Sequence, residues 1–239
     1  MTIPIIRRNF AGAVIIEPYF GRAKNLDRRL ILAVLVGVLT ALAVWQAPRL
    51  LGKGSGASAN VPELEAIQLF SPARPIPDFS LSQSDGTRLI RGELKGHWTV
   101  VFLGFTHCPD ICPTTLAQMQ RIQKNLAKYP ESTRPRVLFV SVDPDRDTPS
   151  HVGDYAHSFS TDTIAATGDI ASLEKFANSI SMTFAKMPPD PGMPADIYSV
   201  DHSASFAVLN PAAELNGFAM APIDFEALGR DLDQLAKVK

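Results

Sequence analysis

Hydrophobic and polar residues are arranged along this chain in two contrasting ways. Residues 30–47 form an apolar run without a charge, in which only Thr40 and Gln46 are polar. At about 1.5 Å per residue, a helix of these 18 residues just spans a hydrocarbon core of about 30 Å. After a glycine- and serine-rich stretch, the rest of the chain shows the short apolar runs and helical stripes of a globular domain. The pattern therefore predicts a membrane helix at 30–47, a flexible linker at 48–64 and a folded domain at 65–239.

Basic residues flank the apolar run unequally, which predicts its orientation. Only Arg49 and Lys53 follow it closely, whereas six cations precede it: Arg7, Arg8, Arg22, Lys24, Arg28 and Arg29. The positive-inside rule places residues 1–29 in the cytoplasm and the domain on the other side, in a bacterial periplasm or a mitochondrial intermembrane space. The alternative is a cleaved signal peptide, with Ala57-Ser58-Ala59 as its cleavage site. The apolar run is longer than such signals use, and that site lies about a dozen residues beyond it.

The domain pattern alternates strands with helices. Continuous apolar runs at 98–105 and 136–142 predict strands buried on both faces, and shorter strands are expected at 77–81, 88–90, 163–167, 182–185, 203–209 and 218–220. Apolar stripes and capping residues predict helices at 113–128, from 147 onward, at 169–180 and at 225–237. This alternation predicts an α/β fold around a mostly parallel sheet.

Charge narrows the choice of partners. Residues 1–53 carry eight Lys/Arg and two Asp/Glu, a net +6, and residues 54–239 carry fifteen and twenty-two, a net −7, which together give the chain's −1. A mildly acidic domain argues against nucleic-acid binding and suits a cationic partner.

The chain has two cysteines, Cys108 and Cys112, at the start of the helix that follows the first buried strand. Residues four apart on a helix have neighbouring side chains, so the pair suits either a disulfide or a grip on a soft metal ion. A helix N-terminus stabilises thiolates, which are both nucleophiles and metal ligands. A strand, a C-x-x-x-C motif and a helix in this order are typical of thioredoxin-like domains. His202, just before a predicted core strand, is a candidate third ligand, and spacing alone also allows an ordinary loop histidine.

Three motifs together resemble the Sco/SenC copper-chaperone family: Gly104-Phe105-Thr106-His107-Cys108-Pro109-Asp110-Ile111-Cys112-Pro113, Val140-Ser141-Val142-Asp143-Pro144-Asp145-Arg146-Asp147-Thr148-Pro149, and Val200-Asp201-His202-Ser203. The resemblance covers about residues 65–238. It implies a thioredoxin-like fold that brings the histidine's strand antiparallel to its neighbour. It also implies one copper ion, Cu(I) or Cu(II), bound by Cys108, Cys112 and His202.

The resemblance further implies a function. Members of the family deliver copper to the dinuclear centre of cytochrome c oxidase subunit II, or keep the cysteines of that centre reduced. The expected role is therefore a membrane-anchored metallochaperone rather than an enzyme, with subunit II, a copper donor and a thiol reductant as partners. The alternative is a thiol–disulfide oxidoreductase that uses a Cys108–Cys112 disulfide. A peroxiredoxin-type peroxidase is disfavoured, because no threonine stands three residues before a lone cysteine.

Other residues near the motifs are weaker candidates. Asp201 is expected to hold the His202 ring as a hydrogen-bond acceptor. His107 is expected to face solvent beside Cys108, and His97, His151 and His157 show no ligand spacing. Asp143, Asp145 and Asp147 alternate as calcium ligands do, but prolines interrupt the loop, so a turn and helix cap are expected. Met182, Met187 and Met193 are expected in the core or in loops rather than on copper.

Overall fold

The computed structural model describes residues 63–189, 191–192, 194 and 197–238, together with residues 32, 37 and 38. The chain divides into two units, Met1–Ala59 and Asn60–Lys239. The predicted cytoplasmic segment, the membrane helix at 30–47 and most of the linker lie outside the described residues. Within the part of the chain that is described, we find no helix with the length and apolar character that crossing a membrane requires.

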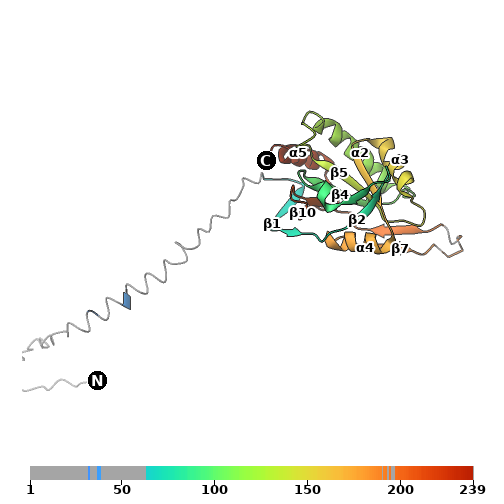
Figure 1. Ribbon diagram of the computed structural model, residues 1–239, viewed down its shortest axis with the longest axis horizontal. Helices are drawn as coiled ribbons and strands as arrows, with labels where there is room; N and C mark the ends of the chain where they lie inside the picture. Colours follow the sequence, from blue (N-terminus) through green and yellow to red (C-terminus); the bar gives the residue numbers. More distant parts are fainter. Residues whose placement is uncertain are drawn as a thin grey trace, which may run out of the picture. The chain divides into compact units, whose positions relative to one another are not determined.

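The larger unit is built on one eight-stranded mixed sheet (Figure 1). Its strands, in spatial order, are β1 (Ile67–Pro75), β10 (Glu214–Ala219), β9 (Phe206–Leu209), β4 (Thr99–Gly104), β5 (Arg136–Ser141), β6 (Thr163–Thr167), β2 (Ser80–Gln83) and β3 (Arg88–Ile90). The three central strands β4, β5 and β6 are parallel, and the remaining neighbours pair antiparallel. A separate hairpin joins β7 (Phe184–Met187) to β8 (Ser199–His202).

Helices cover both faces of this sheet. The crossovers between the parallel strands are α2 (Ile111–Leu126) and α3 (Pro149–Phe159), which contact each other on one face, and α2 also contacts α5 (Phe225–Leu235). On the other side of the sheet, α4 (Ile170–Ser179) lies with the β7–β8 hairpin (Figure 1). One short 3₁₀ turn, η1 (Arg91–Leu94), precedes β4. This layering confirms the predicted α/β class. The expectation of a mostly parallel sheet was wrong, because two of the seven strand pairings in the sheet are parallel and five are antiparallel.

The central strands owe their burial to the helices on both sides. Every residue of β4 is buried, as are all residues of β5 after Arg136, which confirms the prediction from their continuous apolar runs. The largest side chains with almost no exposure include Phe139, Phe176, Phe206, Leu81, Leu89, Leu103, Leu116 and Leu138.

The structure corrects the predicted elements in three places. β1 was not expected, because its polar residues and prolines are not typical of a strand. It lies at the edge of the sheet and pairs with β10, with a register shift between Leu69 and Arg74. β8 was also not expected and pairs with β7, where Phe184 lies opposite His202. Helix α2 begins at Ile111 rather than at Pro113, so Cys112 belongs to its first turn.

Candidate metal centre

The two cysteines lie at the carboxyl end of β4, where the chain turns into α2. The backbone N–H of Cys108 donates to the carbonyl of Phe105 at 3.3 Å and so closes the turn that leaves β4. The backbone N–H of Cys112 points at the Sγ atom of Cys108 at 3.4 Å. The N–H groups in the first turn of a helix have no backbone acceptor within the helix, and here one of them, that of Cys112, is directed at the Cys108 sulfur. Both cysteines are in the free thiol form.

Burial distinguishes the two thiols. Cys112 is fully buried, whereas Cys108 retains 9% of its surface. Burial raises the pKa of the Cys112 thiol far above its ordinary value, and the nearby Cys108 and Asp147 raise it further, against a hydrogen bond from the Phe105 backbone. Cys112 is therefore protonated at neutral pH, and a metal ion that binds its sulfur must displace that proton.

His202 brings a nitrogen atom to the same place from the other end of the chain. It closes strand β8, and its Nε2 atom lies 3.9 Å from the Sγ of Cys112. The rings of Phe102 and Phe105 meet the imidazole edge-on, with centroids 6.1 and 6.2 Å away. Burial among these groups lowers the pKa of His202, so the ring is neutral at pH 7.

The acceptor of the His202 ring differs from the expected one. Its Nδ1 atom lies 3.2 Å from the carbonyl oxygen of Ser203, to which it donates as N–H in the neutral ring. The exposed Asp201 contributes only its charge, which raises the pKa of His202 slightly against burial. Successive strand residues point to opposite faces, so the side chains of Asp201 and His202 diverge. The tautomer set by Ser203 leaves the Nε2 lone pair directed at Cys112.

These donors fit a soft or borderline metal ion. A sulfur atom about 2.3 Å and a nitrogen atom about 2.0 Å from a three-coordinate metal ion lie about 3.7 Å from each other. This is close to the 3.9 Å between the Cys112 Sγ and His202 Nε2 atoms. Two thiolates and a neutral imidazole match the preferences of copper and also of zinc. Met182 is buried in the core and Met187 is exposed on β7, while Met193 lies outside the described residues.

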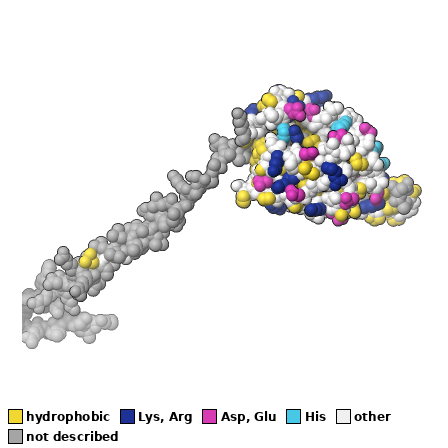
Figure 2. All heavy atoms as spheres, viewed as in Figure 1, with side chains coloured by type: hydrophobic (Ala, Val, Ile, Leu, Met, Phe, Trp, Pro, Cys, Tyr) yellow, Lys and Arg dark blue, Asp and Glu magenta, His cyan; other side chains and the backbone are white. Residues whose placement is uncertain are grey.

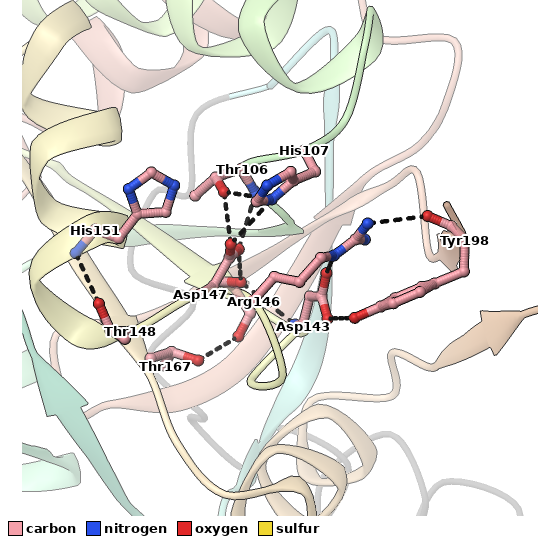
Figure 3. Close-up of polar contacts among 10 residues, drawn as sticks. Thr106, His107, Asp143, Arg146, Asp147, Thr148, His151, Thr167 and Tyr198 are labelled. Atoms are coloured by element: carbon pink, nitrogen blue, oxygen red, sulfur yellow. Dashed lines mark hydrogen bonds and ion pairs between the residues drawn. The ribbon is translucent and has the colours of Figure 1, made fainter. Parts of the chain in front are cut away.

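A polar cluster next to the centre positions the strand that carries His202. Arg146 pairs with Asp143 at 2.6 Å and donates to the carbonyl of Tyr198 at 3.2 Å. The hydroxyl of Tyr198 donates to Asp143 at 2.6 Å, and the guanidinium lies 3.7 Å from the Tyr198 ring centroid (Figure 3). Asp143 is 2% exposed, so its carboxylate is bound by these partners rather than by solvent. The cluster ties the start of β8 to the loop after β5, and the sequence pattern gave no sign of it.

The alternating aspartates of that loop have separate partners. Asp145 pairs with Lys186 of β7 at 2.8 Å, and Asp143 with Arg146, while the side chain of Thr148 caps α3 by accepting from the N–H of His151. This agrees with the expected turn and helix cap.

Comparison with known proteins places this geometry in context. The model of the SCO1/SenC family matches residues 70–237. A protein of Stutzerimonas stutzeri, named for copper binding, is 32% identical over 171 residues, which are 71% of this chain and 80% of the relative. Among mitochondrial Sco relatives, the chain spans only about half of the relative's length, from 43% to 51%.

Two solved structures with copper bound have the same fold. ScoI of Arabidopsis thaliana is 29% identical with a TM-score of 0.58, and the match covers 66% of this chain and 98% of that one. ScoI of Bradyrhizobium japonicum is 30% identical with a TM-score of 0.57, over 67% of this chain and 98% of that one. These likenesses confirm the expected thioredoxin-like fold.

Proposed function

Because the chain belongs to the SCO1/SenC family, we propose that it is a copper metallochaperone whose ligands are Cys108, Cys112 and His202. The observation that carries the proposal is the 3.9 Å approach of a neutral His202 Nε2 to the Cys112 Sγ. A thiol pair that only exchanged disulfides would not need this nitrogen.

The three protein ligands suit a metal ion that is transferred to a recipient protein. Three protein ligands leave a coordination position open, where a ligand of the recipient can bind before the carrier's ligands leave. Soft thiolates favour Cu(I), and the imidazole also accommodates Cu(II). The family resemblance supports the dinuclear copper centre of cytochrome c oxidase subunit II as the recipient.

The proposed location follows from the N-terminal sequence. The apolar run at 30–47 anchors the chain in the membrane, and the excess of cations before it keeps the N-terminus in the bacterial cytoplasm or, in a mitochondrion, in the matrix. The metal centre then lies in the periplasm or the intermembrane space, on the side where copper reaches the oxidase.

A second candidate function is reduction of a partner's disulfide, favoured by the two free thiols beside each other. The partly accessible Cys108 attacks the partner's disulfide as a thiolate and releases one partner thiolate. Cys112, once deprotonated, then attacks the mixed disulfide, which leaves a Cys108–Cys112 disulfide and the second partner thiol. A thiol reductant of the same compartment must return the pair to its reduced form.

A complementation experiment separates the two functions. In cells that lack the wild-type protein, we expect a His202→Ala variant to give low oxidase activity that added copper restores, because delivery needs the imidazole. A Cys112→Ser variant serves as the control that removes both functions. Full oxidase activity of the His202→Ala cells without added copper would refute copper delivery and favour thiol reduction.

A further inference from the structure

A second group of metal-binding side chains lies beside the cysteine loop and shares no residue with the thiol centre. His107, Asp147 and His151 each offer one ligand atom, and these three atoms all lie within 4.8 Å of one another. Figure 3 shows the Asp147 carboxylate below the loop of Thr106 and His107, with the His151 ring beside it. The sequence pattern alone indicated only surface positions for both histidines.

The topology of the sheet explains why the three residues meet. β4 and β5 are parallel neighbours, with Gly104 opposite Ser141, so the loops that leave them lie at the same edge of the sheet. His107 belongs to the first loop and Asp147 to the second, while His151 lies in the first turn of α3. The rings of His107 and His151 are 6.1 Å apart between centroids. Both histidines are exposed, so their rings can turn toward an ion that enters from solvent.

Asp147 is held in a fixed orientation. Only 1% of this residue is exposed. One carboxylate oxygen accepts from the Thr106 N–H at 2.8 Å and from the Ser141 hydroxyl at 2.5 Å, and the other accepts from the Thr106 hydroxyl at 2.5 Å. Because both loops hold it, the carboxylate is preorganised to bind an ion.

The charge of Asp147 is poorly balanced by protein groups. Among the described residues, its one ion-pair partner is the Nδ1 of His107, at 3.6 Å, and no lysine or arginine lies within 4 Å. Asp143, in the same loop, has Arg146 at 2.6 Å instead. A buried carboxylate without a full cation is costly, and a bound cation would remove that cost.

We propose that His107, Asp147 and His151 form a second metal site for a divalent first-row transition ion. Two imidazoles and one carboxylate are borderline and hard donors, so the site selects Cu²⁺, Zn²⁺ or Ni²⁺ and not Cu⁺, which prefers sulfur. Ligand atoms that lie about 2.1 Å from a tetrahedral ion are about 3.4 Å from one another. The three ligand atoms here lie within 4.8 Å of one another, and rotation of the exposed histidine rings shortens these distances toward that value. The site goes beyond the proposed function and does not depend on it.

The test is a Zn²⁺ titration by calorimetry of the full chain with Cys108 and Cys112 oxidised to a disulfide, so that thiolates do not compete. We expect one equivalent to bind the wild type, and His151→Ala and His107→Ala each to weaken binding at least tenfold. His157→Ala is the matched control, an exposed histidine on the same helix, and should bind Zn²⁺ like the wild type.

Imidazole NMR resonances give a second readout, because Zn²⁺ should shift those of His107 and His151 and leave that of His157 in place. The titration is repeated in a Cys108→Ser/Cys112→Ser variant and should give the same equivalent. Absence of Zn²⁺ binding to the wild type, or unchanged binding by His151→Ala, would overturn the proposal. Neither result bears on copper binding by the thiols, so failure of this site and of the proposed function are distinguishable.

Discussion

Gly104, the last residue of β4, gives the sharpest test of how the fold shapes the thiol centre. A Cβ atom at this position would lie 2.8 Å from Cε2 of Phe139, 2.9 Å from Sγ of Cys112 and 3.3 Å from Cζ of Phe102. Non-bonded carbon atoms prefer about 3.5–4.0 Å, so the first two contacts must each open by more than half an ångström. Phe139 and Cys112 are both fully buried, and protein interiors are close-packed, so moving either side chain disturbs its neighbours.

Overpacking of this kind costs about 1–3 kcal/mol, so Gly104→Ala should lower the free energy of unfolding by that amount. The same methyl group pushes the Cys112 sulfur away from its position 3.9 Å from His202. We expect the copper dissociation constant to rise at least tenfold, equivalent to about 1.4 kcal/mol. Urea unfolding of the reduced, metal-free protein and competition titration with Cu(I) measure the two effects.

Gly229 in α5 provides the matched control. A Cβ there would meet Ile122 at 3.5 and 3.9 Å, ordinary contact distances. Gly229→Ala should leave copper affinity unchanged and raise stability by up to about 1 kcal/mol, because alanine favours the helix. A Gly104→Ala protein that unfolds within about 0.5 kcal/mol of the wild type and binds copper as tightly would show that the added methyl group meets no such obstruction.

Two further predictions concern a buried carboxylate and proton release. Asp231 of α5 is fully buried and accepts three backbone N–H groups at 2.7–2.9 Å, from the residues that lead into β1. Asp231→Ala should lower the free energy of unfolding, measured in urea, by about 3 kcal/mol or more. The comparison is Asp233, which is partly exposed and pairs with Lys128 and Lys237, and Asp233→Ala should cost under about 1 kcal/mol. Copper affinity should rise at least tenfold between pH 7 and pH 8. Burial raises the pKa of Cys112, so this thiol must lose a proton when copper binds, whereas burial lowers the pKa of His202, so the neutral ring has no proton to lose. A pH-independent affinity, or Asp231→Ala as stable as Asp233→Ala, would contradict these arguments.

The parts of the fold that the sequence pattern predicted are those with a strong local signal. β4 and β5 are continuous apolar runs because helices cover both sheet faces, and Thr148 and Asp169 cap their helices with their side chains as expected. β1 escaped prediction because its residues mix polar and apolar types without alternation, and its partner β10 lies more than 100 residues away.

The thiol centre was predictable only in part. The cysteines are neighbours on one helical turn, but His202 is 90 residues from Cys112, and no local pattern sets the direction of its strand. The family resemblance supplied that link. Strand alternation alone indicates that Asp201 faces away from the side to which His202 points.

Figure 2 shows acidic and basic side chains interspersed over the visible face of the folded unit, without a broad region of one sign.

The most direct test of the account is the ligand set of the protein loaded with one equivalent of Cu(I), read by X-ray absorption at the copper edge. We expect two sulfur ligands and one imidazole nitrogen in the wild type. His202→Ala should lose the imidazole signal and bind copper at least tenfold more weakly, while its thiols remain free to form a disulfide. An unchanged imidazole signal and wild-type affinity in His202→Ala would contradict the claim that Cys108, Cys112 and His202 hold the metal.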